Sequence, residues 1–265
     1  MSGRTLAIAN QKGGVGKTTT AINLGTALAL GGSRVLLVDM DPQANLTSGV
    51  GLKGQSAPAG TIYQALTGEF QDAGAFVLPT RVERLSLVPA DRNLTGAEVE
   101  LVSISNRERR LRALVYSLRD RFDYIFIDTP PSLGLLTLNA LVAADAVLIP
   151  LTCEYFALEG IADLIATLRR VRATLNPALD IAGVLMTMHD ERTNLGQQVA
   201  RDIRTFFQER VFETVIPRNI RLGEAPSHGM PAIIYDARSR GAEAYVALAR
   251  ELRARETRSP AAVEP

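Results

Sequence analysis

The chain has 265 residues, 46% of them apolar, and its formal net charge at pH 7 is +1. This length supports a large core, and the balanced charge excludes a protein that binds nucleic acid through its overall positive charge. The single cysteine, Cys153, excludes an intrachain disulfide and fits a reducing cytoplasm. No run of 18 apolar residues and no signal-peptide pattern is found, so we expect neither a membrane span nor export.

The first predicted unit is a strand, a glycine-rich loop and a helix. An apolar run at 6–9 leads into Gln-Lys-Gly-Gly-Val-Gly-Lys-Thr-Thr at 11–19, and apolar residues at helical spacing follow. Glycines let backbone N–H groups surround an anion, and the start of the helix adds partial positive charge. Lys17 would contact the β- and γ-phosphates of a nucleotide, and the Thr18 hydroxyl can reach Mg²⁺. The expected phosphate-binding residues are Lys12, Gly13, Gly14, Val15, Gly16, Lys17, Thr18 and Thr19.

The use of lysine supports this interpretation over a glycine turn that binds nothing. Lysine and arginine together number 29, yet only Lys12, Lys17 and Lys53 are lysines, and two of these three lie in the loop. A compact ammonium group differs from the planar guanidinium that the chain uses elsewhere. The loop also departs from the common phosphate-loop pattern, because Gln11 replaces its first glycine and Lys12 is an additional lysine.

A second candidate site segment follows the apolar run at 34–39, which has the length of a buried parallel strand. Asp39 ends this run, and Asp41 lies two residues further on, before Pro42. Functional groups of open α/β sheets lie at the carboxyl ends of strands, which favours a role for both aspartates. The alternative is a pair of ordinary turn aspartates.

The remaining elements alternate between strands and helices. Along the chain we expect a surface loop at 45–60, a short helix at 61–66, strands at 85–88, 124–128, 146–151, 181–188 and 214–217, and helices at 94–122, 158–175, 194–207 and 241–255. This alternation predicts an α/β fold with a doubly wound, mostly parallel sheet, helices on both faces and a ligand at the carboxyl ends of the strands. We favour one domain, 1–258, with a disordered tail at 259–265, over two small domains.

Several motifs together resemble one family. The segment 12–19 is similar to the deviant Walker A loop of the ParA/MinD ATPases, which are P-loop NTPases, with Lys12 as their signature lysine. Asp-Met-Asp-Pro-Gln at 39–43 and Phe-Ile-Asp-Thr-Pro-Pro-Ser at 126–132 resemble the second motif and the Walker B strand of the ParA/Soj chromosome-partition branch. Further similar segments are 154–160, 216–219 and 224–229.

The resemblance implies roles for individual side chains. Lys12 would reach across a dimer interface to the ATP of the partner subunit, and Lys17 would neutralise the phosphates. Asp41 would orient the attacking water, so the implied catalytic residues are Lys12, Lys17 and Asp41. Asp128 would hold Mg²⁺ through water and Asp39 would support the metal's shell, which makes Thr18, Asp39 and Asp128 the implied metal residues.

The resemblance also bears on the base and on the cysteine. Pro217 and Asn219 fall where this family binds adenine, and the alternative is a simple turn at the end of a strand. Iron–sulfur relatives in the family bridge two subunits with a pair of cysteines per chain. Cys153 alone does not supply that set, so we expect it to be inert.

The function implied is that of a ParA-type ATPase, which hydrolyses ATP to ADP and phosphate with Mg²⁺. Such a protein would form an ATP-dependent homodimer, bind DNA non-specifically and drive chromosome or plasmid segregation with a ParB/Spo0J-type centromere-binding protein. It would be cytoplasmic and nucleoid-associated, without a membrane partner.

Three other functions were weighed. A MinD-like or other cargo-positioning ATPase of the membrane type needs an amphipathic C-terminal helix, and 248–258 has only a thin apolar stripe. A metabolic synthetase needs a second substrate site, for which we find no motif. A DNA-binding regulator with a vestigial ATP site would be expected to lose Lys17 or Asp41, and both are present.

The DNA-binding residues expected are Arg192, Arg218 and Arg221. From His189 onward every formally positive side chain is an arginine, and these three are predicted to lie in loops. A dimer would bring two copies of each onto one surface. The alternative is that they are scattered solvated arginines.

Overall fold

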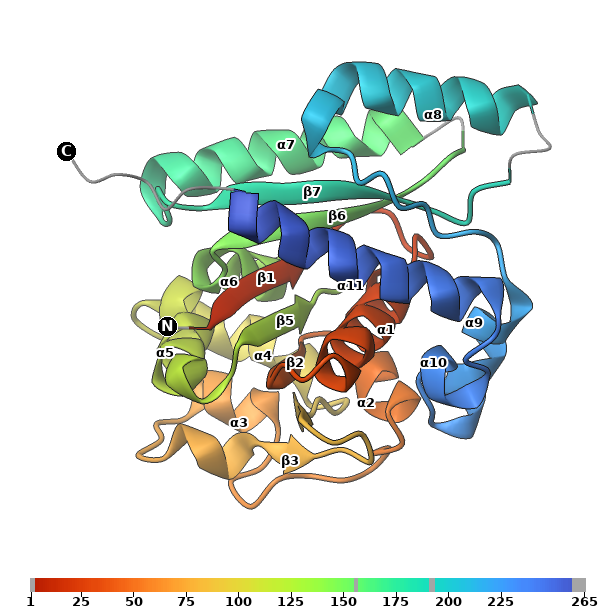
Figure 1. The fold of residues 1–265 in the computed structure, drawn as a ribbon. Coiled ribbons are helices and arrows are strands. Elements are labelled where there is room, and N and C mark those ends of the chain that lie inside the picture. The colour runs from red at the N-terminus through yellow and green to blue at the C-terminus, as the bar shows by residue number, and fades with distance from the viewer. Residues whose placement is uncertain (1–2, 155–156, 191–193, 259–265) are drawn as a thin grey trace.

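A computed structural model describes residues 3–154, 157–190 and 194–258, and Figure 1 shows their fold. The described residues form a seven-stranded sheet in the order β3-β4-β2-β5-β1-β6-β7. Every neighbouring pair is parallel except β3, which pairs antiparallel with β4 at one edge. The strands are β1 (Arg4–Ile8), β2 (Val35–Asp39), β3 (Leu78–Pro79), β4 (Leu85–Val88), β5 (Tyr124–Asp128), β6 (Ala146–Thr152) and β7 (Asp180–Thr187).

Helices connect the parallel strands. Those described are α1 (Lys17–Leu30), α2 (Asn45–Gly49), α3 (Ile62–Thr67), α4 (Leu94–Glu100), α5 (Arg110–Leu118), α6 (Leu135–Ala143), α7 (Ala157–Thr174), α8 (Asn194–Phe207), α9 (Ile220–Glu224), α10 (Ala232–Tyr235) and α11 (Arg240–Arg258). Short 3-10 turns lie between several of them.

The sheet has an apolar core on each face, because successive strand residues point to opposite sides. In β1, Leu6 and Ile8 belong to a core shared with α1 and α11, whereas Ala7 belongs to a core shared with α5 and α6. Figure 1 shows α1 and α11 crossing one face of the sheet, and these two helices are in contact. The predicted doubly wound, mostly parallel sheet with helices on both faces is therefore confirmed.

The strand predictions were accurate where both faces of a strand are buried. The strands at 85–88 and 124–128 have the predicted bounds, the one at 146–151 is one residue longer, and the one at 181–188 is shifted by one residue at both ends. The helix at 194–207 also has its predicted bounds. Helix α6 was not anticipated, although its residues are mostly apolar.

The prediction of a surface loop over 45–60 was wrong at its start, where α2 forms. Leu46 and Thr47 are buried there, so this segment packs on the core despite its small polar residues. Gly49 permits the close approach, because an added Cβ would lie 2.5 Å from the Ile22 side chain of α1. Small residues indicated a loop, but they serve here to let two helices pack closely.

Two other predicted elements also differ. The predicted helix 94–122 is divided between α4 and α5, since the backbone is extended at Ile104 and left-handed at Asn106 (φ 55°). The predicted strand 214–217 is not formed. The chain there lies beside the end of β7, where the Ile216 N–H donates to the Met186 carbonyl, and an isolated bridge joins His189 and Pro217.

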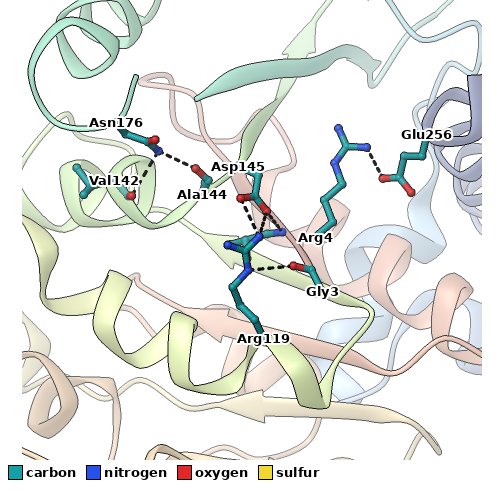
Figure 2. A network of polar contacts seen from close by, with 9 residues as sticks. Gly3, Arg4, Arg119, Val142, Ala144, Asp145, Asn176 and Glu256 are labelled. Carbon is teal, nitrogen blue, oxygen red and sulfur yellow. Dashed lines mark hydrogen bonds and ion pairs between the residues drawn. The ribbon is translucent and has the colours of Figure 1, made fainter. Parts of the chain in front are cut away.

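At the amino ends of the strands, a network of polar contacts joins distant parts of the chain (Figure 2). The Arg119 guanidinium donates to both oxygens of Asp145 (2.9 and 2.7 Å), and the Thr5 N–H donates to the same carboxylate (2.8 Å). Arg4 pairs with Glu256 of α11 at 2.6 Å. The Asn176 side chain donates to the Ala144 carbonyl just after α6. This end of the sheet is therefore held by charges and amides that are bonded to one another.

Candidate active site

The loop between β1 and α1, residues 9–16, is the predicted phosphate-binding loop, and we call it the cup. Its shape depends on two glycines. Gly14 and Gly16 have φ values of +73° and +89°, a region in which side chains with a Cβ are strained. These left-handed turns lead directly into α1, which is 14 residues long and has Gly16 at its N-cap. The segment at 11–19 thus has the strand–loop–helix context that phosphate binding requires.

Neighbouring strands hold the cup in place. The Asn10 side chain accepts from the Lys12 N–H (2.9 Å) and donates to the Pro150 carbonyl in β6 (2.7 Å). The Thr187 hydroxyl at the end of β7 donates to the Val15 carbonyl at 2.8 Å. The loop is therefore preorganised by β6 and β7 and not by its own residues alone.

The Lys17 side chain curls back over the loop. Its Nζ donates to the Lys12 carbonyl at 3.1 Å, and the residue is only 7% exposed. Burial lowers the pKa of the Lys17 ammonium, and the nearby carboxylates of Asp128 and Asp41 oppose that shift. A desolvated cation in the cup attracts a phosphate strongly, since little water screens the interaction.

Two aspartates end adjacent strands beside the cup. Asp39 of β2 and Asp128 of β5 are partners in the parallel register, and both are fully buried. Asp128 Oδ2 accepts from the Thr18 hydroxyl at 2.7 Å, whereas Oδ1 is buried without a hydrogen-bond partner in the described part of the chain. Burial, and then the charge of Asp39, raise the pKa of Asp128 well above its usual value.

The oxygens of Asp39 are occupied by the chain itself. Oδ1 accepts from the Asp41 N–H (3.1 Å), and Oδ2 accepts from both the N–H (2.8 Å) and the hydroxyl (2.6 Å) of Thr47. Burial raises the pKa of Asp39 to about 6 in spite of these donors. Asp39 is thus placed to support the loop that carries Asp41.

The donor set fits Mg²⁺, which prefers hard oxygen ligands and keeps waters and phosphate oxygens around it. The Thr18 hydroxyl is bonded to one oxygen of Asp128, and the other oxygen of that carboxylate has no partner among the described residues. Within the described residues no group of three or more His, Cys, Asp or Glu could hold a metal ion. Thr18 and Asp128 would hold Mg²⁺ together with waters and phosphate oxygens, as this cation prefers.

A small cavity continues from the cup along α1. It measures about 180 Å³ and is lined by Gly16 and Thr19 of the loop region and by Pro217 and Asn219. The Tyr245 side chain of α11 closes one side. The two residues predicted to contact a base are thus brought next to the phosphate loop, across about 200 residues of sequence.

The Lys12 side chain bonds to a residue outside its own loop. Its Nζ lies 2.8 Å from Glu154 Oε2, and Arg218 lies 3.9 Å from the other oxygen of the same carboxylate. The bond to Lys12 lowers the pKa of Glu154. The two lysines therefore have different partners, which are a carboxylate after β6 for Lys12 and a backbone carbonyl of the loop for Lys17.

The three arginines predicted to bind DNA have different surroundings. Arg192 lies outside the described residues. The Arg218 side chain is 66% exposed and follows the bridge at Pro217. Arg221 was predicted in a loop, but it lies in α9 and pairs with Glu224 (2.8 Å) and Asp236 (3.2 Å).

Four supporting residues were not among the predicted site residues, although one of them, Glu154, begins the segment 154–160 that resembles the family. Asn10, Thr47, Glu154 and Thr187 bond directly to predicted site residues. The position of Asn10 beside the loop, and of Thr187 at a strand's carboxyl end, offered some signal. The sequence around Thr47 offered none, since it was assigned to a loop.

Comparisons with known proteins agree with this geometry. Residues 3–181 match a family model described as an AAA domain. The chain is 55% identical over 255 residues to the chromosome partitioning protein ParA of Myxococcus xanthus, covering 96% of this chain and 89% of that one. It is 53% identical over 252 residues to the sporulation initiation inhibitor protein Soj of Bacillus subtilis, covering 95% and 99%.

A solved structure extends the comparison to the fold. The cobyrinic acid a,c-diamide synthase from Mycobacterium smegmatis, with bound ATP analog and magnesium, superposes with a TM-score of 0.83 at 37% identity. The match covers 97% of this chain and 96% of that chain.

None of the helices that the described residues form has the length and apolar content needed to cross a membrane.

Proposed function

The chain belongs to the ParA/Soj family of chromosome-partitioning ATPases, and we propose that it hydrolyses ATP to ADP and phosphate, with Mg²⁺, to drive DNA segregation. The observation that carries the proposal is the carboxyl edge of the sheet. Lys17, Thr18, Asp41 and Asp128 converge there, and one buried oxygen of Asp128 lacks a partner among the described residues. A buried carboxylate without a partner is costly unless a ligand completes it.

The nucleotide would lie along the start of α1. Backbone N–H groups of 13–18 and the Lys17 ammonium would bind the phosphates, and the cavity beside Pro217 and Asn219 would take the base. Thr18 and Asp128 would hold Mg²⁺, which, when bound, adds positive charge at the phosphate oxygens. Asp39 would support that shell indirectly, because the chain occupies both of its oxygens.

Asp41 would orient the attacking water. Its Oδ1 accepts from the Gln43 N–H at 2.9 Å, and its own N–H is held by Asp39, so both ends of the residue are fixed. Asp41 is 8% exposed, which leaves little freedom to move. Catalysis of phosphoryl transfer rests mainly on such positioning and on charge neutralisation.

ATP would also join two copies of the chain. Lys12 would leave Glu154 and contact the ATP of the partner subunit, a role that fits its partly exposed ion pair outside its own loop. The dimer would bind DNA without sequence preference through Arg192, Arg218 and Arg221. A ParB/Spo0J-type protein would stimulate hydrolysis, and the protein would act in the cytoplasm on the nucleoid.

The membrane alternative is disfavoured by the packing of α11. Its apolar residues Tyr245, Leu248, Ala249 and Leu252 are buried against the sheet and α1, so they are not available to a lipid surface. The two relatives named for partition or sporulation control are 55% and 53% identical, against 37% for the diamide synthase. A partition role is therefore the function we propose.

Three lysine variants test the proposal, because the chain has only three lysines. Lys17→Ala should abolish ATP binding or hydrolysis. Lys12→Ala should bind ATP but not dimerise with it, as measured by light scattering. Lys53→Ala, in an exposed position, is the matched control and should behave as wild type. A Lys12→Ala protein that still dimerises like wild type would remove the cross-subunit role.

DNA binding is tested separately by retention on DNA with ATP across a salt series. If the arginines contact phosphates, the logarithm of the binding constant should fall linearly with the logarithm of the salt concentration. The slope should be about −0.9 for each neutralised phosphate. The Arg192→Ala/Arg221→Ala double variant and Arg218→Ala should bind more weakly with a flatter slope, and should still dimerise. Arg81→Ala, which changes an exposed arginine before β4, is the control. If DNA affinity and salt dependence are unchanged in both test variants, these arginines do not form the DNA-binding surface.

A further inference from the structure

Thr47 lies at the centre of a buried chain of hydrogen bonds next to the active site. It is 1% exposed, in the third position of α2. Its hydroxyl donates to Asp39 Oδ2 at 2.6 Å and accepts from the Ala90 N–H, just after β4, at 3.0 Å. The Thr47 N–H donates to the same Asp39 oxygen at 2.8 Å. One side chain thus links the ends of two adjacent strands.

The hydrogen-bond chain continues to Asp41. The second oxygen of Asp39 accepts from the Asp41 N–H at 3.1 Å. Each donor and acceptor on this path is in a buried residue, so a lost partner is not replaced readily by water. The orientation of the Asp39 carboxylate therefore determines where the backbone of Asp41 lies.

We propose that Thr47 is a positioning residue for ATP hydrolysis, which acts through Asp39 to hold Asp41 where it orients the water. The inference rests on the proposed function, because it assigns Thr47 to the same site. Without the hydroxyl, Asp39 keeps only two backbone donors, and the Ala90 N–H loses its acceptor. A small displacement of Asp41 then lowers turnover without removing any contact to the nucleotide.

The competing explanation is that Thr47 only anchors α2 to the core. Such a role would lower stability, and it would affect turnover only as far as the protein unfolds. The two explanations are separated by comparing Thr47 with Thr61. Thr61 is 2% exposed, and its hydroxyl also bonds to a carboxylate, Asp91, at 3.2 Å, but at the start of α3.

The experiment compares Thr47→Val, Thr47→Ser and the control Thr61→Val in the full chain. We expect Thr47→Val to lower kcat by about 10- to 100-fold while the KM for ATP changes by less than about twofold. Thr47→Ser keeps the hydroxyl and should restore most of the turnover. Thr61→Val should lose stability but keep kcat. Thr47→Ala replaces Thr47→Val if that variant does not fold.

A double variant tests the path through Asp41. In the Asp41→Ala background, Thr47→Val should cause no further loss of turnover, because the group it positions is gone. Independent, multiplicative losses would overturn the proposal. So would a folded Thr47→Val protein with the kcat of wild type.

Amide hydrogen exchange of the segment 40–48 gives a readout that needs no ATP. Exchange there should be faster in Thr47→Val than in wild type and unchanged in Thr61→Val. Unchanged exchange in Thr47→Val would overturn the proposal. Failure of the proposed function looks different: wild type would not hydrolyse ATP, or Asp41→Ala would retain full activity.

Discussion

The two ends of the sheet differ in how the chain surrounds an acid: Asp145 at the amino ends is half-buried, and Asp128 at the carboxyl ends is fully buried. At the amino ends of the strands, Asp145 accepts two bonds from Arg119 and one from the Thr5 N–H (Figure 2). At the carboxyl ends, Asp128 receives one hydroxyl, from Thr18, and its other oxygen has no partner in the described part of the chain. The residue types are the same, but only one of the two carboxylates is completed by the protein.

The difference separates stability from function. A carboxylate that is paired with a guanidinium and a backbone N–H ties distant segments together at little electrostatic cost. A buried carboxylate with one unpartnered oxygen costs free energy, and burial raises the pKa of Asp128. Perturbed groups of this kind cluster at functional sites. At the carboxyl ends the chain leaves one oxygen of Asp128 without a partner among the described residues. A nucleotide with its cation would supply that partner.

The first prediction is a large loss of turnover in Asp41→Ala. Removing a group that positions the water should lower ATP turnover by about 10²- to 10⁴-fold, with a much smaller change in ATP affinity. Steady-state kinetics and equilibrium ATP binding check this. Asp123→Ala removes an exposed acid paired with Arg34 at the amino end and should leave turnover unchanged. Equal losses in affinity and turnover would make Asp41 a binding residue instead.

The second prediction concerns Cys153, which directly follows β6 at the carboxyl end. Burial raises the pKa of this thiol to about 11. Since only the thiolate reacts, alkylation by iodoacetamide at pH 7 to 8 should be on the order of 100-fold slower than that of a free thiol. The rate should still rise about tenfold per pH unit at pH 9, because the folded pKa lies above that range.

Mass spectrometry follows the reaction without interference, since Cys153 is the only cysteine. Urea-unfolded protein is the control and should react at the rate of a free thiol. A native rate that levels off near pH 8 would show that the thiol is not desolvated, and would weaken the contrast between the two ends of the sheet.

A matched pair of substitutions should separate the two ends directly. Asp128→Asn should abolish hydrolysis yet raise the melting temperature of the nucleotide-free protein without Mg²⁺. The sign follows from the raised folded-state pKa: the folded protein holds the proton more tightly, so wild type loses stability as pH rises. The advantage of Asp128→Asn should therefore grow with pH.

Asp145→Asn should have the opposite outcome. It leaves Arg119 with weaker acceptors and should cost about 1–2 kcal/mol of unfolding free energy, because this pair is partly exposed. ATP turnover should not change. Urea unfolding with both variants, together with ATPase assays, checks the pair. If folded Asp145→Asn protein loses turnover, the amino ends of the strands also contribute to activity, and the proposed separation of stability from function is wrong.

The smallest effect is expected from Glu154→Gln, which releases Lys12 from its ion pair. Both side chains are partly exposed (51% for Glu154 and 36% for Lys12), and such pairs contribute about 0.2–1 kcal/mol. ATP-dependent dimers should form at a protein concentration lower by up to about fivefold. Light scattering measures this, with surface Glu69→Gln as control. Weaker dimerisation would mean that Glu154 itself contributes to the interface.

The sequence alone determined the phosphate loop and the buried strands. Gly14 and Gly16 are required by local backbone geometry, and β2 and β5 are continuous apolar runs. Both signals are contained within a few neighbouring residues, so they can be read without knowledge of the fold. The placement of Asp39 and Asp128 at strand ends follows from the same runs, which is why the acidic part of the site was also predicted.

Only the tertiary structure decided how those residues are supported. The bonds from Thr187 to Val15, from Lys12 to Glu154 and from Ala90 to Thr47 join residues that are 172, 142 and 43 positions apart. No local pattern specifies such partners, because they meet only when the strands align at one edge of the sheet. Helix α2 was not predicted for the same reason. Leu46 and Thr47 lie in a segment whose composition suggests a loop, and they are buried only because α1 and β2 pack around them.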